Sequence, residues 1–383
     1  MSTKTMGAGR GRAADLLLQL INTAPELTRT DLVERSGLSS STVAQVVSRL
    51  VDDGLVAETV RGKGPGTGSG RPARTLSIVP QGTVVGAVDF GHRRVRVALG
   101  DDAGQVLGEV KLHIDVDLRA REAMELAGRY LHQLVKDLAV KHPSLVVAGI
   151  PGPLDGETGQ VCSPTILSSW VGLEPKRELE SYLGTTVHVE NDAVLGAWGE
   201  LHGREGRALE DFVYIKVSNG VGAAMVMRGE VYRGSRGLAG EIGHTRLSGH
   251  NELCRCGGRG CLETVVTLSA VTEELRYTHP QLDPQHIRLA ELTDPTAHRI
   301  LEESGRTLGV VLAPLCNLLN PAAVVLGGEL GASGEPFVRG VRASVHRFAL
   351  PGSSAEVELA ASVWGERAEL MGALVMAGQM ARV

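Results

Sequence analysis

One histidine and three cysteines stand close together in this chain of 383 residues, at a spacing that suits a metal ion. The four are His244, Cys254, Cys256 and Cys261. Glycines at 257, 258 and 260 let the segment turn tightly enough for all three thiols to reach one ion. One imidazole and three thiolates complete a tetrahedral zinc site. We therefore expect a structural Zn²⁺, with the flanking Glu241 and Glu263 held beside it and facing a binding pocket.

Two alternative roles for the cysteines fit the sequence less well. Reduced, buried cysteines would not need to cluster, yet three of the five fall within eight residues, while Cys162 and Cys316 are isolated and resemble ordinary core residues. Disulfides are disfavoured by the odd count and by the lack of a secretory signal. Zinc remains the prediction.

Several motifs together resemble the ROK family, named for repressors, open reading frames and kinases. Glu-x-Gly-His at 241–244 is followed by Cys-x-Cys-x4-Cys-x-Glu at 254–263. Pro-Gly-Pro-Leu-Asp at 151–155 is similar to the family's Pro-Gly-Pro-Val-Asp turn, and Glu-Asn-Asp-Ala stands at 190–193. The resemblance covers nearly the whole chain.

The resemblance implies a sugar site. Its residues would be Asn191, Asp192, Glu241, His244 and Glu263. Carboxylates and an amide suit vicinal hydroxyls, which both donate and accept hydrogen bonds. His244 could bind zinc through one ring nitrogen and face the sugar with the other. The stretch 163–170 departs from the family loop that carries a sugar-contacting Asn before a Trp, since Thr165 or Ser168 stands there instead.

The ATP half of the family pattern is damaged. Family kinases carry Asp-x-Gly-Gly-Thr and Gly-Thr-Gly-x-Gly loops, whose backbone amides hold phosphate. Here the first loop reads Asp-Phe-Gly-His-Arg at 89–93, and the second reads Ser-Asn-Gly-Val-Gly at 218–222. Two losses indicate that phosphoryl transfer is gone, so we predict no enzyme activity. Asp192, the match to the kinases' general base, would remain as a vestigial base that binds a hydroxyl.

Strands that alternate with helices predict an α/β body over residues 81–383. Strands are expected around a turn at 89–91 and at 146–150, 187–190 and 324–326, with a helix from about 119 to 141. A second strand-turn-strand unit begins near Val213, and this duplication resembles the two-lobed actin and hexokinase (ASKHA) architecture. Lobe 1 would hold about 81–195 plus a C-terminal helix at about 366–383, and lobe 2 about 196–365.

Residues 1–80 predict an α+β winged helix-turn-helix domain. A first helix at 12–22 precedes Thr28 and Asp31 at capping-box spacing, Gly37 breaks the second helix, and Ser39 is a good N-cap for the third. The third helix has an apolar stripe and a polar face, as a recognition helix requires. Its candidate DNA contacts, with two in a cationic wing at 61–74, are Ser40, Ser41, Thr42, Gln45, Ser48, Arg49, Arg71 and Arg74. A flexible linker is the alternative for the cationic loop, and a protein-interaction module is the alternative for the three helices.

The charge is unevenly divided. The net charge is −5, but residues 1–80 hold ten Lys or Arg against seven Asp or Glu, while the remainder holds 29 against 37. A basic N-terminal piece on an acidic body is a modest indication of DNA binding. No apolar run is long enough to span a bilayer, so we expect no membrane partner and a cytoplasmic location.

These features predict a sugar-responsive transcriptional regulator, most simply a repressor that a small sugar, a sugar phosphate or another sugar derivative releases from double-stranded DNA. Paired winged helices would require a homodimer or homotetramer. An ATP-dependent sugar kinase with an appended DNA-binding domain is the alternative. A DNA-binding partner of a phosphotransferase-system protein, without a small ligand, is the third.

Overall fold

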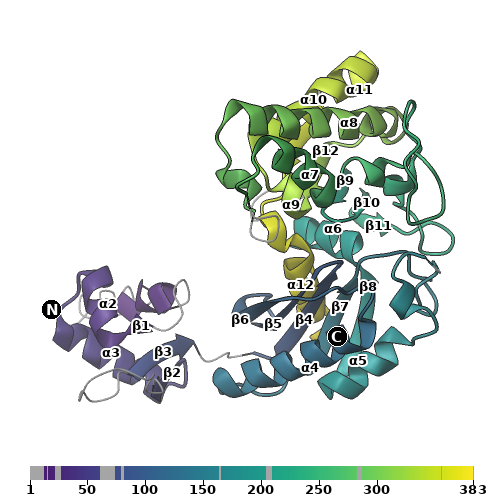
Figure 1. The fold of residues 1–383 in the computed structure, drawn as a ribbon. Coiled ribbons are helices and arrows are strands. Elements are labelled where there is room, and N and C mark those ends of the chain that lie inside the picture. Colours follow the sequence, from purple (N-terminus) through teal and green to yellow (C-terminus); the bar gives the residue numbers. More distant parts are fainter. Residues whose placement is uncertain are drawn as a thin grey trace. The chain divides into compact units, whose positions relative to one another are not determined.

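The structure, a computed structural model, describes residues 13–14, 16–21, 27–60, 74–78, 82–163, 165–203, 209–282, 287–354 and 356–382. The chain forms two compact units (Figure 1). One comprises Met1–Thr83 with Lys136–Lys141, and the other Val84–Val135 with His142–Val383.

The N-terminal unit is a winged helix-turn-helix, as predicted. Residues 13–14 and 16–21 are helical. Helices α2 (Arg29–Ser36) and α3 (Ser40–Asp52) follow, and strand β3 (Arg74–Ile78) pairs with both β1 (Leu27–Thr28) and β2 (Val56–Val60). Strand β1 was not predicted, because a strand of two residues is too short to show an alternating pattern of polar and apolar residues.

The predicted caps of α2 and α3 and the predicted apolar stripe of α3 are confirmed. Thr28 and Asp31 form a reciprocal capping box, and Gly37 ends α2 in the left-handed conformation at φ 68°. The Ser39 side chain accepts a hydrogen bond from the Thr42 amide at the start of α3. The predicted apolar stripe of α3 is buried in the core of this unit. Its members are Val43, Val46, Val47 and Leu50.

The second unit contains two five-stranded sheets with the same topology. The first has the order β6-β5-β4-β7-β8, and the second β11-β10-β9-β12-β13. The first sheet comprises β4 (Val84–Gly91), β5 (Arg94–Asp101), β6 (Val106–His113), β7 (Leu145–Ile150) and β8 (Thr186–Asn191). The second comprises β9 (Phe212–Val217), β10 (Val221–Met227), β11 (Glu230–Tyr232), β12 (Ala323–Gly327) and β13 (Glu358–Ala361).

In each sheet, three antiparallel strands are followed by two parallel ones. This repetition is the duplication that the sequence suggested, and it identifies the sugar-kinase-like fold. Strands β4, β7 and β9 are buried along their whole length, which explains why they are mainly apolar without alternation; the exceptions are the buried charges Asp89 and Lys216.

Helices cover both sheets (Figure 1). Helix α12 (Ala368–Ala381) packs on β4 and β7, and it crosses α6 (Asp192–His202), which packs on β9 and β10. Helices α4 (Ala120–Asp137) and α5 (Pro175–Leu183) belong to the first half of this unit. Its second half contains α7 (Leu268–Thr278), α8 (Pro295–Leu319), α9 (Gly328–Gly331), α10 (Glu335–Phe348) and α11 (Pro351–Ser354).

Two predicted boundaries were wrong. The turn of the first hairpin lies at His92 and Arg93, because Asp89–Gly91 continue strand β4 in register with β5. Helix α4 ends at Asp137 rather than near 141, and Ala139 has a positive φ of 52°, which an α-helix does not accommodate.

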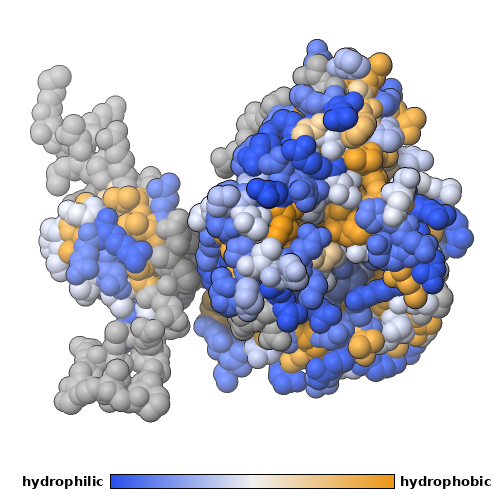
Figure 2. All heavy atoms as spheres, turned by 45° about the horizontal axis from the view of Figure 1, so that its top comes forward, coloured by the Kyte–Doolittle hydropathy of each residue, from blue (hydrophilic) through white to orange (hydrophobic). Residues whose placement is uncertain are grey.

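Among the described residues, no helix is both long and apolar enough to cross a membrane. The face of the second unit seen in Figure 2 is mainly hydrophilic, with separate hydrophobic areas. Such scattered apolar groups are ordinary on protein surfaces.

Candidate functional site

The histidine and the three cysteines meet at one point. Their ligand atoms all lie within 4.8 Å of one another. His244 Nδ1 is 3.6 Å from Cys254 Sγ, and Cys256 Sγ is 3.7 Å from Cys261 Sγ. Gly257 and Gly260 have φ of 87° and 71°, and these left-handed turns fold the loop back on itself.

This group fits a tetrahedral zinc ion. Zn–S bonds of about 2.3 Å give a tetrahedral edge of about 3.8 Å, close to both of these separations. A disulfide would need sulfurs about 2.05 Å apart, and the cysteines are free. The Gly258 amide also donates to Cys256 Sγ at 3.4 Å, which stabilises a thiolate. The cluster could therefore hold a metal through His244 Nδ1 and the three sulfurs.

The other nitrogen of His244 faces the predicted sugar residues. Its Nε2 lies 3.8 Å from Glu241 Oε2. Burial, together with the charges of Asp192 and Glu263, raises the pKa of Glu241 to about 7. Glu263 is itself held by the Val221 amide, which donates to its Oε2 at 3.2 Å. Three carboxylates and one imidazole thus gather beside the metal cluster, a set that suits sugar hydroxyls.

Asn191 has a mainly structural part in this arrangement. Its Oδ1 accepts hydrogen bonds from the amides of Ala193 at 2.9 Å and Val194 at 3.2 Å, as the N-cap of α6. Its Nδ2 donates to the Gly152 carbonyl at 3.0 Å. The predicted sugar contact therefore already uses its oxygen and one amide hydrogen to place Asp192.

Asp192 is buried and forms an ion pair with Lys216 of β9. Its other oxygen accepts a hydrogen bond from the Ala193 amide at 2.7 Å. Burial favours the neutral amine, but Asp192 and other nearby carboxylates outweigh it and raise the pKa of Lys216. Both carboxylate oxygens of Asp192 are therefore engaged, Oδ2 by the Lys216 ammonium and Oδ1 by a backbone amide.

His92 lies against the second damaged phosphate loop. A methyl group placed on Gly220 would lie 2.6 Å from His92 Nε2 and 3.3 Å from Glu263 Oε2. The imidazole therefore occupies the surface of this glycine, where backbone amides would otherwise be open to an anion.

Arg94 fills the first damaged loop in the same way. Its guanidinium lies over Gly91, where it leaves no room even for a methyl group. It pairs with Asp89 at 3.4 Å and with Glu329 at 3.4 Å. Burial opposes ionisation of Glu329, but Arg94 lowers its pKa to about 2, so the pair is charged on both sides. The space at both loops is thus taken by the chain's own side chains.

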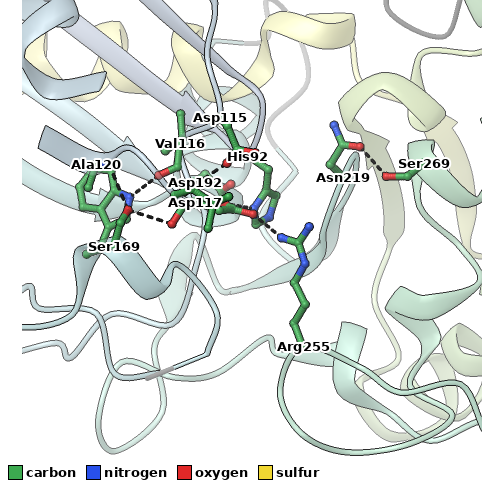
Figure 3. A network of polar contacts seen from close by, with 12 residues as sticks. His92, Asp115, Val116, Asp117, Ala120, Ser169, Asp192, Asn219, Arg255 and Ser269 are labelled. Carbon is green, nitrogen blue, oxygen red and sulfur yellow. Dashed lines mark hydrogen bonds and ion pairs between the residues drawn. The ribbon is translucent and has the colours of Figure 1, made fainter. Parts of the chain in front are cut away.

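Asp117 connects His92 to the metal loop, which we define as residues 244–261. His92 Nδ1 is 2.7 Å from Asp117 Oδ1, and Arg255 pairs with Asp117 Oδ2. Figure 3 shows both partners pointing toward Asp117. Burial would raise the pKa of Asp117, but His92 and Arg255 outweigh it and lower this pKa. An ionised Asp117 accepts, so His92 Nδ1 carries the hydrogen and Nε2 faces Gly220.

Residues 163–170, which depart from the family's sugar loop, contain two side chains that donate hydrogen bonds to the backbone of Val116 and Asp117. Ser169 donates to the Asp117 carbonyl through its amide at 3.2 Å and its hydroxyl at 2.8 Å. Trp170 Nε1 donates to the Val116 carbonyl at 2.9 Å. The predicted alternatives Thr165 and Ser168 make neither of these contacts, so this stretch serves to position Asp117.

The predicted DNA-contacting side chains of α3 point to solvent. Five of the six are exposed and Thr42 is half-buried. The exposed ones are Ser40, Ser41, Gln45, Ser48 and Arg49. Ser48 also lies 3.3 Å from Arg29 Nη1. Arg74 begins strand β3 rather than ending the wing, and its Nη1 is 3.3 Å from Glu58, while Arg71 lies outside the described residues.

Sequence reasoning missed the charged residues that fill and brace this site. Lys216, Arg94 and Asp117 belong to no motif of the resemblance, and Arg255 stands at an unspecified position between two cysteines of the motif. Two of them had a usable signal: a single lysine inside the apolar run 212–217, and an arginine at the start of the buried strand β5. A charge inside a buried run requires a partner.

Comparison with known proteins agrees with this description. The ROK family model matches residues 85–380, and the MarR family model matches residues 10–64. The xylose repressor of Bacillus subtilis (strain 168) is 27% identical, over 93% of this chain and 92% of that protein. The DNA-binding transcriptional dual regulator NagC of Escherichia coli (strain K12) is 26% identical, over 87% of this chain and 84% of that protein.

Solved structures share the fold. A ROK family transcriptional regulator, a homolog of the E. coli MLC protein, covers 97% of this chain and 96% of its own with a TM-score of 0.64 at 23% identity. A ROK family glucokinase from Streptomyces griseus in complex with glucose and AMPPNP has a TM-score of 0.66 at 26% identity, over 77% of this chain and 99% of its own. Since the ROK model spans well over half of its 383 residues, this protein belongs to the ROK family.

Proposed function

We propose that this protein is a sugar-responsive transcriptional repressor. One observation carries the proposal: helix α3, with its exposed polar face, precedes a ROK domain in which Glu241 lies near Asp192 and Glu263, while His92 and Arg94 lie against Gly220 and Gly91. The repressors of similar sequence support it. Residues 1–80 bind DNA and residues 81–383 bind the effector, in lobes of about 81–195 with 366–383, and about 196–365.

The DNA contacts come from α3 and the wing. Ser40, Ser41, Thr42, Gln45, Ser48 and Arg49 read the major groove. Arg71 enters an A·T-rich minor groove from the wing, and Arg74 reaches the DNA backbone from the start of β3. The face of α3 opposite its buried stripe supports this assignment, because those side chains are not needed for folding.

The effector binds at Asp192, Glu241, His244 and Glu263, with Asn191 positioning Asp192 and offering its remaining amide hydrogen. A structural Zn²⁺ on His244, Cys254, Cys256 and Cys261 fixes the orientation of the imidazole. A sugar shifts the protein between two states by binding one of them better, and the state with the sugar holds the heads of a homodimer or homotetramer at the wrong spacing for DNA.

Phosphoryl transfer is not part of this function, although the fold is that of a kinase. Catalysis requires ATP phosphates to be positioned against the sugar and a free base to accept the hydroxyl proton. His92 and Arg94 lie over the two loop glycines, and Lys216 holds Asp192. All three contacts oppose transfer, so we expect no ATP-dependent sugar phosphorylation.

A gel-shift titration at fixed salt, on the DNA upstream of this protein's own gene, tests the proposal. We expect one specific complex that a single monosaccharide dissociates. Arg49→Ala should weaken operator binding by about tenfold, since a good side chain–base pair is worth about 1–3 kcal/mol. The matched control is Arg347→Ala, because Arg347 is exposed on α10 in the other unit. No specific complex, or equal binding by both variants, would refute the DNA-binding assignment.

A further inference from the structure

We infer that His92 is a specificity residue that restricts the effector to sugars without a phosphate ester. The inference rests on the proposed function, because it concerns the same sugar site. His92 stands at the turn between β4 and β5, and its imidazole lies over Gly220 next to Glu263. A substituent that extends from the sugar toward this glycine therefore meets the imidazole first.

The position of the imidazole is fixed by two elements. Asp117 holds Nδ1 at 2.7 Å, and Arg255 of the metal loop holds Asp117. The side chains of His92 and Asp117 are only 10% and 11% exposed. Asp117 is braced in turn by Ser169. His92 therefore cannot move away from Gly220 without breaking its contact with Asp117, which Arg255 of the metal loop holds in place (Figure 3).

The charges around His92 oppose a phosphate as well. The carboxylates of Asp192 and Glu263 lie close enough to Glu241 to act on it electrostatically, and these acidic groups would repel a dianion. Three neighbouring cations are already paired with carboxylates of the protein. Lys216 pairs with Asp192, Arg94 with Asp89 and Glu329, and Arg255 with Asp117. A hydroxyl group needs no such cation, and carboxylates are good acceptors for it.

Isothermal titration of the full-length, zinc-loaded protein tests this inference. The probes are D-glucose, D-mannose and N-acetyl-D-glucosamine, each paired with its 6-phosphate ester, which keeps the same pyranose ring. We expect the wild type to bind one free sugar and to bind its phosphate ester much more weakly. His92→Gly should reduce the ratio of the two Kd values by about tenfold or more, since it removes both a clash and a cover over the amides.

Two further variants separate specificity from structure. His92→Gln preserves the size and one hydrogen bond and should keep the wild-type ratio. His346→Gly, on the exposed face of α10, is the matched control and should also keep it. If His92→Gly unfolds at too low a temperature to be titrated, His92→Ser opens the same space and can be measured instead.

The outcomes distinguish this inference from the proposed function. A wild type that binds a phosphate ester as tightly as the free sugar, with release from the operator, overturns the role of His92 but leaves the repressor intact. An unchanged ratio in His92→Gly and His92→Ser overturns it too. A wild type that binds no member of any pair refutes the sugar site itself, and the inference with it.

Discussion

At the residue scale, the site is decided by which polar groups the protein has already paired. Asp192 is held by Lys216, and Asn191 by the helix it caps. Glu241 and the Nε2 side of His244 are left to face each other at 3.8 Å. Under the proposed function, the paired groups set the shape of the site and the remaining groups would bind the effector, because a buried polar group that is left unmatched is costly.

The zinc ligands give a prediction at this scale. Cys256→Ser should lower zinc affinity by about a hundredfold or more, since four ligands share a binding free energy of about 10–16 kcal/mol. After dialysis against a chelator, the zinc content per chain, measured by mass spectrometry, should be near one in the wild type and near zero in Cys256→Ser. Cys162→Ser, at an exposed cysteine outside the cluster, should retain the metal. Full retention in Cys256→Ser would contradict the assignment.

At the element scale, the two sheets are joined by the crossing of α6 and α12. The helices approach closely because both carry glycines at the contact. A methyl group on Gly372 would collide with the Leu195 carbonyl, and one on Gly199 would lie 3.1 Å from the Gly372 backbone. Helix α6 begins with Asp192, so the crossing also sets the position of a site residue.

Substitution at this crossing gives a second prediction. Gly372→Ala should reduce the free energy of unfolding by about 1–3 kcal/mol, because an inserted methyl group separates two packed backbones. Thermal unfolding followed by circular dichroism measures the change. The control is Gly352→Ala on α11, where a methyl group meets nothing within 4 Å. Similar melting temperatures for the two variants would show that the crossing adapts without cost.

At the scale of the whole molecule, the two sheets of the second unit enclose several charges. Glu369 of α12 is fully buried, and its Oε1 accepts a hydrogen bond from the Tyr214 hydroxyl at 2.8 Å. Burial raises the pKa of Glu369 to about 7, although Lys216 nearby acts in the opposite direction. The folded protein therefore binds a proton here that the unfolded chain releases nearer pH 4.5.

This proton makes stability depend on pH. Between about pH 5 and pH 7 the folded state holds more protons at Glu369 than the unfolded state, so this group lowers the free energy of unfolding as pH rises. Glu369→Gln mimics the protonated acid and should gain about 1–3 kcal/mol relative to the wild type between pH 5.5 and pH 8. Urea unfolding followed by tryptophan fluorescence at four pH values measures this difference. Glu273→Gln, at an exposed carboxylate, should show no change with pH in its free energy of unfolding relative to the wild type. If the difference between Glu369→Gln and the wild type is also independent of pH, the carboxyl of Glu369 stays ionised in the folded protein.

The sequence by itself determined the elements whose signals are local. The capping box at Thr28, the buried stripe of α3 and the strands at 146–150 and 324–326 were all predicted, because periodicity and caps depend on neighbouring residues. The spacing of the histidine and cysteines likewise predicted a cluster that could hold a metal. The missing phosphate-loop residues were also visible.

Only the tertiary structure decided which side chains lie at those two loops and which residues hold them there. His92, Asp117 and Arg255 come from a hairpin turn, the segment before α4 and the metal loop, and no pattern along the chain links them. The same holds for Asp89, Arg94 and Glu329, whose charges pair only once β4, β5 and α9 are assembled. The sequence shows which charges are present, whereas their partners depend on long-range packing, because an ion pair forms where the fold brings opposite charges together and not where they stand in the sequence.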